Sequence, residues 1–283
     1  MLKIKYNFDI SKVSYIKVGG KVKLYIETDE IEALKKIIKI SKKIKYIGNT
    51  SNIFFCFDYN EYIFIKYINN KIIIGEYLEL GSSVSLKYLV PFLIENEISG
   101  FEKLGGIPCK IGGAIVNNIS CFNQCITSNL VEILVMDDCG KINVIKKEEL
   151  LFSHHLSSLQ NKDILVLYSK FKIIKENREC LISRQKTVDN IRKTKQPYNK
   201  LTLGSTFKHY DDINVPLLIE NLNLKGKKID KAQISMVHSN FIEVTSNCNF
   251  ENIISLIELT NRLLYNKLGY YIDLEIETIR GKK

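Results

Sequence analysis

Apolar residues recur at helical spacing in four segments of the chain. These predicted helices cover residues 29–43, 82–97, 215–222 and 250–268. In the first, Asp29 and Glu32 have the spacing of a capping box, which would fix the start of the helix. In the second, Pro91 removes a backbone donor, so we expect a kink or an early break there.

Short runs rich in Ile, Val, Phe and Tyr lie around these helices and predict β-strands. In the first third of the chain they cover residues 22–26, 45–47, 53–57, 62–65 and 72–74. The later strands are expected at residues 131–136, 141–145, 164–174, 233–235, 241–244 and 270–279. This order of elements indicates the α+β class, with a mostly antiparallel sheet in the middle of the chain.

The elements divide the chain into three predicted parts, at residues 1–75, 76–183 and 184–283. The segment 178–200 is strongly charged and ends in Gln196-Pro197. We expect it to connect the second part to the third.

The composition is that of an ordinary globular protein, because 45% of the 283 residues are hydrophobic and 25% are charged. Lys and Arg number 41 against 31 Asp and Glu, but the charge is spread along the chain, so no nucleic-acid partner is expected. The apolar runs are too short to span a bilayer, and the N-terminal residues lack the apolar core of a signal peptide. We therefore expect a cytoplasmic protein with no membrane partner. We also expect a monomer, although none of these patterns determines the oligomeric state.

Seven cysteines occur at irregular spacing and without a C-x-x-C pair. This pattern indicates neither a zinc site nor a redox pair, so we expect reduced side chains and no bound metal.

Two segments with clustered small residues indicate that the backbone closely approaches another molecule. Residues 46–55 read YIGNTSNIFF, and the polar turn between two predicted strands leaves backbone N–H groups free to face an anion. Residues 104–118 read LGGIPCKIGGAIVNN, where two glycine pairs allow the main chain to wrap around a diphosphate. A plain strand connection and a glycine-rich packing turn are the respective alternatives. Neither segment is a G-x-G-x-x-G fingerprint or a P-loop, which argues against a classical dinucleotide-binding fold.

These and five further segments resemble, in order and spacing, the motifs of the UDP-N-acetylenolpyruvoylglucosamine reductase family. They are VGG at 18–20, GNTSN at 48–52, GFEKLGGIPCKIGGA at 100–114, QP at 196–197, GSTFK at 204–208, QISMVHSNF at 233–241 and GYYIDLEI at 269–276. The resemblance runs nearly from end to end. It implies a two-lobed FAD-binding module of the vanillyl-alcohol-oxidase-like type, followed by a C-terminal α+β substrate-binding domain. The short chain resembles the compact subtype, which lacks an inserted tyrosine loop.

The resemblance also implies a reaction and its cofactors. Members of the family reduce the enolpyruvyl ether of a UDP-sugar, UDP-N-acetylglucosamine enolpyruvate, to UDP-N-acetylmuramate for peptidoglycan synthesis. NADPH is the electron donor, and FAD carries the hydride. By resemblance, the cofactor-binding residues are Gly48, Asn49, Thr50, Ser51, Asn52, Gly105, Gly106, Ile107, Pro108, Gly112, Gly113 and Ala114.

The catalytic roles are implied in the same way. Ser205 matches the family's proton donor, and Glu275 matches a carboxylic acid that assists protonation. Lys208, Gln196 and His238 are expected to bind the substrate. Outside the motifs, Ser205 would be an ordinary turn residue, and Glu275 and Lys208 would be solvated charges.

One departure from the family pattern concerns a charged group. The motif F-x-Y-R-x-S reads FSHHLS at residues 152–157, so His155 stands at the position of the active-site arginine. Histidine offers neither a permanent charge nor a bidentate fork. Either a charged His155 acts in place of the arginine, or Arg184 or Arg192 supplies the cation, or activity is reduced. Ordinary polar loop residues are the remaining alternative.

Two other functions stay open at this point. One is a flavin oxidase that acts on another substrate, although an oxidase needs neither a protonating serine nor Glu275. The other is a catalytically inactive binding protein, which only the two adjacent histidines favour.

Overall fold

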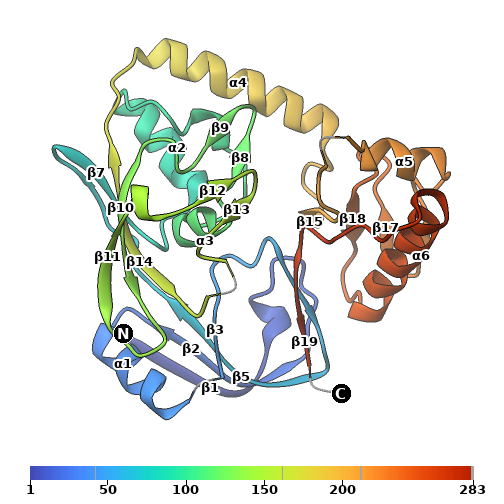
Figure 1. The fold of residues 1–283 in the computed structure, drawn as a ribbon, viewed down its shortest axis with the longest axis horizontal. Helices are drawn as coiled ribbons and strands as arrows, with labels where there is room; N and C mark the ends of the chain where they lie inside the picture. Colours follow the sequence, from blue (N-terminus) through green and yellow to red (C-terminus); the bar gives the residue numbers. More distant parts are fainter. Residues whose placement is uncertain (42, 161, 211, 282–283) are drawn as a thin grey trace. The chain divides into compact units, whose positions relative to one another are not determined.

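The computed structural model describes residues 1–41, 43–160, 162–210 and 212–281 (Figure 1). The chain forms two compact units. Unit 1 holds residues 1–6, 24–49 and 62–189, and unit 2 holds residues 7–23, 50–61 and 190–283. The N-terminal part of the chain therefore contributes to both units. The division into three parts at residues 75 and 183 stays a prediction.

A four-stranded sheet is built from the N-terminal part of the chain. Its strand order is β1 (Leu2–Asp9), β2 (Lys21–Thr28), β5 (Tyr59–Tyr67) and β3 (Ile44–Tyr46). Strand β3 runs parallel to β5. The neighbouring helix α1 (Ile31–Ile40) buries Leu34 and Ile38 in the core of unit 1, which fixes its apolar face.

Helix α1 confirms the helix expected at residues 29–43 but is shorter, and position 42 of that range lies outside the described residues. The expected capping box is wrong. The residue at the N-cap is Glu30, whose side chain makes no capping hydrogen bond, and Asp29 binds the amino terminus of Met1 instead. The Asp29 carboxylate, which was expected to cap the helix, therefore binds the positively charged amino terminus and not the backbone N–H groups of α1.

Unit 1 is centred on a five-stranded sheet. Its order is β11 (Ile142–Lys146), β10 (Leu130–Met136), β14 (Leu165–Lys172), β7 (Tyr77–Gly81) and β6 (Ile72–Ile74). Every neighbouring pair is antiparallel, which confirms the predicted antiparallel lobe. Helices α2 (Leu86–Glu95) and α3 (Ile111–Val116) share one apolar core with this sheet (Figure 1).

Two helices of unit 1 differ from the expectations. Helix α2 contains Pro91 and continues to Glu95, so the early break does not occur. The segment expected to be a charged connection forms α4 (Arg178–Lys195), a helix that runs from unit 1 into unit 2. Its buried residues Leu181, Val188 and Arg192 recur at helical spacing, so one narrow face packs while the rest of the helix is solvated.

Unit 2 contains a second antiparallel sheet with two helices. The strand order is β15 (Leu201–Ser205), β18 (Phe241–Val244), β17 (Ala232–Ile234) and β16 (Lys228–Ile229), and helices α5 (Val215–Asn221) and α6 (Phe250–Leu268) pack on it. Asn249 caps α6 at its start, and Gly269, with φ of 83°, ends it.

The last predicted strand is much shorter than expected. Of residues 270–279, only the end belongs to β19 (Glu277–Arg280), which pairs in parallel with β4 (Ile53–Cys56). The residues before it are held by other contacts of unit 2, described below.

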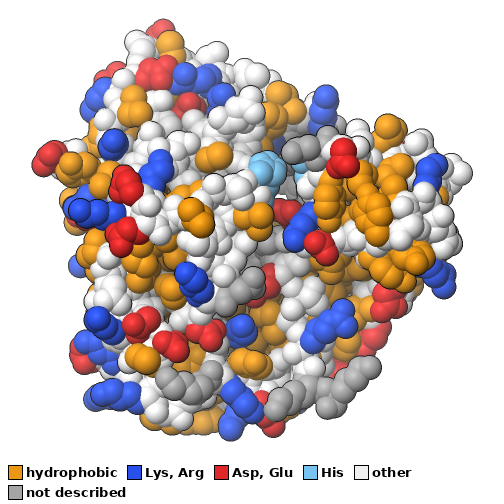
Figure 2. Space-filling model, viewed as in Figure 1, with side chains coloured by type: hydrophobic (Ala, Val, Ile, Leu, Met, Phe, Trp, Pro, Cys, Tyr) orange, Lys and Arg blue, Asp and Glu red, His pale blue; other side chains and the backbone are white. Residues whose placement is uncertain are grey.

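The surface and the cysteines complete this description. Figure 2 shows Lys and Arg side chains interspersed with Asp and Glu on the face in view. All seven cysteines lie in the described residues, and none of them forms a disulfide. The helices in the described part of the chain are too short or too polar to cross a bilayer.

Candidate active site

The two glycine-bearing segments meet in unit 1. Gly48 follows β3, and a Cβ built on it would touch nothing within 4 Å. The next residue, Asn49, donates a hydrogen bond from Nδ2 to the Pro108 carbonyl, at 2.6 Å. The turn at 48–49 is therefore fastened to the loop of residues 104–114.

The rest of the GNTSN segment belongs to unit 2. Thr50 is buried, and its φ of 56° places it in the left-handed region. Its hydroxyl accepts from the Tyr15 N–H at 2.8 Å and donates to the Val13 carbonyl at 3.3 Å. The Thr50 side chain therefore serves the turn itself, while Ser51 remains partly exposed.

The loop 104–114 exposes backbone on one side. Gly106 is exposed, with φ of 81°. Gly112 is buried, and a Cβ there would lie 2.9 Å from the Ser82 Cβ, so the packing of unit 1 itself requires this glycine. Gly113 is exposed, and a Cβ there would touch nothing within 4 Å. Within this glycine pair, only Gly113 presents unhindered backbone to an incoming molecule.

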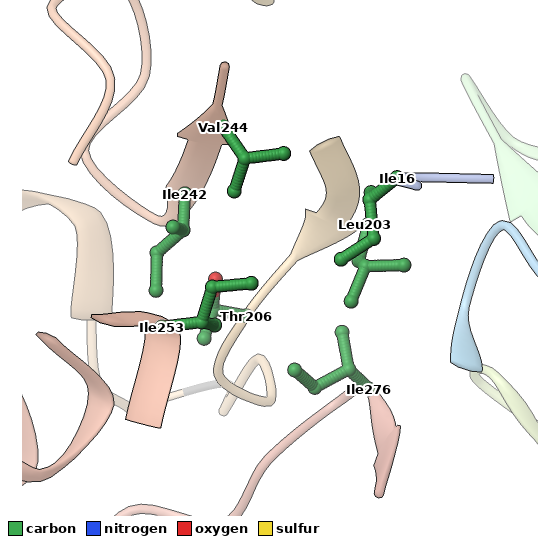
Figure 3. A pocket seen from close by; sticks show the side chains of 7 residues that line it. All are labelled: Ile16, Leu203, Thr206, Ile242, Val244, Ile253 and Ile276. Carbon is green, nitrogen blue, oxygen red and sulfur yellow. The ribbon is translucent and has the colours of Figure 1, made fainter. Parts of the chain in front are cut away.

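In unit 2, a β-bulge determines where Ser205 points. Thr202 pairs with Glu243 and Ser205 with Phe241, so β15 has one residue more than β18 over this stretch. The extra residue is accommodated at Gly204, where φ is 81°. As a result Leu203 and Thr206, three positions apart, line the same apolar cavity (Figure 3). Ser205 therefore lies on the opposite side of its strand from the cavity.

That cavity is part of the core and not the substrate site. Its volume is about 10 Å³, room for about one water molecule. Its lining is apolar apart from Thr206, with Ile276 facing Leu203 across it (Figure 3). The side chains that border Ser205 and Glu275 in sequence are thus anchored in the core.

Glu275 is held opposite Thr206, the neighbour of Ser205, by backbone pairing. The Glu275 N–H donates to the Thr206 carbonyl and the Lys208 N–H to the Asp273 carbonyl, both at 2.9 Å. We call these paired segments, residues 205–208 and 273–275, the catalytic ladder, after the roles that the sequence predicts for Ser205 and Glu275. Asn52 of the GNTSN segment donates from Nδ2 to the Glu275 carbonyl at 3.3 Å, which links the first glycine-bearing segment to the ladder.

The environment of Glu275 favours its protonated form. Burial raises the pKa of its carboxyl, and the nearby charges of Lys208 and His209 lower it by less. Lys208 Nζ pairs with Asp273 Oδ2 at 3.2 Å, and both side chains are solvated. A carboxyl that retains its proton nearer neutral pH suits a proton-donating role.

Asn240 fixes the start of the ladder. Its backbone carbonyl accepts from the Thr206 N–H at 2.7 Å, and its side chain exchanges two hydrogen bonds with the Phe207 backbone, at 2.9 and 3.0 Å. The Asn240 N–H in turn donates to His238 Nδ1 at 3.3 Å. Because burial lowers the pKa of His238, its ring is a neutral acceptor.

His154 and His155 form the turn of a short hairpin in unit 1, between β12 (Phe152–Ser153) and β13 (Leu156–Ser157). Their rings meet edge to face at 4.3 Å, and His155 has φ of 52°. Ser120 Oγ lies 3.3 Å from His154 Nδ1.

The hairpin is tied to the end of α3. Ser157 Oγ donates to the Val116 carbonyl, and Asn118 Nδ2 donates to the Ser153 carbonyl at 2.7 Å. Gln160 Nε2 donates to the His155 carbonyl at 3.1 Å. The hairpin that carries the two histidines is thus bonded to the end of α3, the helix that begins in the glycine-rich loop.

The two arginines considered as replacement cations have other partners. Arg184 forms ion pairs with Glu102 and Glu176, at 3.1 and 2.5 Å. Arg192 is buried, and its Nη1 donates to Gln196 Oε1 at 3.5 Å. Gln196 itself is partly buried where α4 ends.

The predicted site residues therefore fall into two groups. Unit 1 brings together Gly48, Asn49, Gly105, Gly106, Ile107, Pro108, Gly112, Gly113, Ala114 and His155. Unit 2 holds Thr50, Ser51, Asn52, Gln196, Ser205, Lys208, His238 and Glu275. Within unit 2, Asn52, Ser205, Lys208 and Glu275 meet at the catalytic ladder.

Sequence reasoning missed two residues that shape the site. Asn240 lies inside the motif QISMVHSNF, but nothing in the pattern distinguishes it from its polar neighbours. Ser82 accepts from the Gly112 N–H at 2.9 Å through its backbone carbonyl, which no side-chain pattern can indicate.

Comparisons with known proteins identify the family. A protein-family model described as "UDP-N-acetylenolpyruvoylglucosamine reductase, C-terminal domain" matches residues 196–279. A UDP-N-acetylenolpyruvoylglucosamine reductase from Fusobacterium nucleatum is 32% identical over 284 residues, which cover 99% of this chain and 100% of the relative. The chain belongs to the UDP-N-acetylenolpyruvoylglucosamine reductase family.

Other members agree with this assignment. A UDP-N-acetylenolpyruvoylglucosamine reductase from Aquifex aeolicus is 29% identical, covering 97% of this chain and 95% of its own. The crystal structure of the reductase from Thermus caldophilus matches with a TM-score of 0.85 and 24% identity, over 98% of each chain. The latter similarity confirms the expected α+β reductase fold.

Proposed function

We propose that this protein reduces UDP-N-acetylenolpyruvoylglucosamine to UDP-N-acetylmuramate, a step in the synthesis of peptidoglycan precursors. NADPH is the electron donor, and FAD is the bound cofactor. The observation that carries the proposal is the 32% identity to a reductase of that name over nearly the whole of both chains.

The residues present fit FAD. Gly113 and Gly48 offer backbone with open space where a Cβ would stand, and Gly106 is exposed. Such surfaces allow a diphosphate to approach backbone N–H groups without a steric clash. The hydrogen bond from Asn49 to the Pro108 carbonyl joins the two segments. Ile107 belongs to the second of them.

The catalytic ladder supports the proton-transfer roles. Bound FAD would supply the hydride that the enolpyruvyl double bond accepts. Ser205 donates a proton to the adjacent carbon as negative charge develops beside the substrate carboxylate. Glu275, whose pKa burial raises, assists this protonation. A hydride and a proton together convert the vinyl ether to the lactyl ether.

The remaining residues bind charge or position the substrate. Lys208 is solvated enough to exchange Asp273 for a phosphate or carboxylate group of the substrate. Gln196 and His238 offer hydrogen bonds. His155 takes the position of the family's arginine and stabilises the developing negative charge when it is protonated. Two observations favour His155 over Arg184 as the cation. The hairpin that carries His155 is held by Asn118, and Arg184 is already engaged in ion pairs.

The same proposal includes a setting for the enzyme. The protein acts as a monomer in the cytoplasm, where NADPH and UDP-sugars are available, and it needs neither nucleic acid nor membrane. The interspersed charges on the face in Figure 2 support this view.

The experiment that tests the proposal measures reduction and reoxidation of the flavin by its absorbance. Purified protein with FAD is mixed with NADPH without oxygen, and the loss of flavin absorbance is recorded. UDP-N-acetylenolpyruvoylglucosamine is then added, and we expect reoxidation together with a product that is two hydrogens heavier.

Two results would contradict the proposal. Reoxidation by oxygen alone, with no reduced sugar nucleotide, would indicate an oxidase. A protein that binds no FAD would indicate a binding function.

A further inference from the structure

Glu102 is a buried carboxylate at the entrance to the glycine-rich loop. Only 3% of the residue is exposed. Its Oε2 accepts from the N–H groups of Gly100 and Phe101, at 2.8 and 3.1 Å. The carboxylate therefore closes the turn that precedes Gly105.

Arg184 of α4 neutralises this buried charge. Its Nε lies 3.1 Å from Glu102 Oε1, and its Nη2 lies 2.5 Å from Glu176 Oε2. Both interactions favour the charged guanidinium and raise the pKa of Arg184. The next residue of the helix, Gln185, lies against Gly105, where an added Cβ would be 3.4 Å from its Nε2.

The turn between Glu102 and Gly105 transmits this arrangement to the loop. Glu102 begins a short 3-10 helix that ends at Leu104, which is fully buried. The Leu104 carbonyl accepts from the Ile107 N–H at 3.3 Å, across the two glycines. A shift of Glu102 would therefore move Gly105 and Gly106 with it.

We infer that Glu102 and Arg184 are positioning residues for the cofactor, and that their ion pair sets how tightly the loop 104–114 holds FAD. The inference rests on the proposed function, because it concerns the FAD that this function requires. The pair adjoins the loop through Leu104 and Gln185, and we expect its effect to be on retention of FAD and not on the chemical step. It explains why α4, a helix solvated on most of its surface, carries an arginine on its packed face.

The test measures release of FAD from the loaded enzyme. Wild-type and variant holoenzymes are diluted, and the rise in flavin fluorescence gives the rate and extent of dissociation. Arg184→Met should weaken FAD binding at least tenfold, because it leaves the buried Glu102 carboxylate without its counter-charge. The double variant Glu102→Gln/Arg184→Met should recover part of the affinity, because the buried unpaired charge at position 102 is then gone.

Two matched controls separate positioning from general instability. Glu176→Gln removes the other partner of the Arg184 guanidinium. Arg178→Met changes another residue of α4 and breaks its exposed pair with Glu95 of α2. Both should retain FAD within about threefold of wild type, because neither change leaves the buried Glu102 carboxylate without its partner. Thermal unfolding of each FAD-free variant is recorded in parallel.

Arg184→Met holoenzyme that releases FAD like wild type would overturn the inference and leave the proposed function intact. Release that follows only a loss of folding, with normal FAD affinity well below the melting temperature, would also overturn it. Wild-type protein that binds no FAD would instead overturn the proposed function.

Discussion

The glycine-rich loop of unit 1 and the catalytic ladder of unit 2 carry their proposed roles in opposite ways. The loop works by leaving side chains out, since Gly113 and Gly48 face open space. The ladder works by holding side chains in place, because a backbone pair fixes Glu275 opposite Thr206, the neighbour of Ser205. A region of the first kind is damaged by added atoms, and one of the second kind by removed atoms.

The largest expected effect is in the ladder. Ser205→Ala should slow reoxidation of the reduced flavin by substrate by about 10²–10⁴-fold, because it removes the proton donor. Reduction by NADPH should stay unchanged, since no proton from Ser205 is needed there. Stopped-flow absorbance measures both half-reactions. Equal losses in both would show that Ser205 has another role.

The loop offers a comparison between neighbouring glycines. Gly113→Val should weaken FAD binding by about 10–100-fold while the FAD-free protein stays folded, because its Cβ enters open space. Gly112→Val should instead lower the free energy of unfolding by about 1–3 kcal/mol, because its side chain meets Ser82. Flavin fluorescence and thermal unfolding distinguish the two. Full retention of FAD by Gly113→Val would remove Gly113 from the cofactor site.

His155 tests whether unit 1 also contributes a charge. His155→Ala should slow the substrate half-reaction by about tenfold or more, as expected when a charge-assisted hydrogen bond is lost. His155→Arg should retain activity and reduce its loss at alkaline pH, because a guanidinium stays charged and an imidazole does not. The rate of reoxidation across the pH range is the measurement. A silent alanine variant would show that the hairpin is only a connection.

The smallest effect concerns the stability of the ladder. Because the folded protein raises the pKa of Glu275, the native state binds a proton that the unfolded chain releases, and stability falls as pH rises through that interval. Glu275→Gln has no such loss. It should raise the melting temperature at about pH 8 and leave it unchanged below about pH 4, where the unfolded carboxyl is also protonated. An equal effect at both pH values would assign the change to packing.

Local signals explain which elements the sequence could predict. Helix α6 was predicted at its observed bounds, because its apolar stripe lies between the cap Asn249 and Gly269. Helix α4 was missed because polar residues occupy positions of its packed face, notably Arg184 and Arg192. Their placement on this face depends on partners in other segments, such as Glu102 for Arg184, which a periodic pattern does not contain.

The candidate site divides in the same way. The motifs indicated Ser205, Glu275 and the glycine pairs, and their roles stay predictions. The arrangement around them could not be predicted, because it depends on pairing between distant segments. Asn240 holds Phe207 and Asn52 holds Glu275 through backbone groups that every residue has. The different roles of Gly112 and Gly113 depend on Ser82, thirty residues earlier.

The bulge at Gly204 has a consequence for how this gene tolerates change. Because the bulge takes up the one extra residue between Thr202 and Ser205, Leu203 and Thr206 share a side of the strand although they are three positions apart. Replacing Gly204 by a residue that disfavours its φ of 81° would leave every other letter of GSTFK intact. If the strand then paired without the bulge, regular alternation would turn the serine hydroxyl towards the hydrophobic interior and present the threonine in its place. Substitutions of this glycine should therefore be selected against more strongly than most substitutions in the same strand.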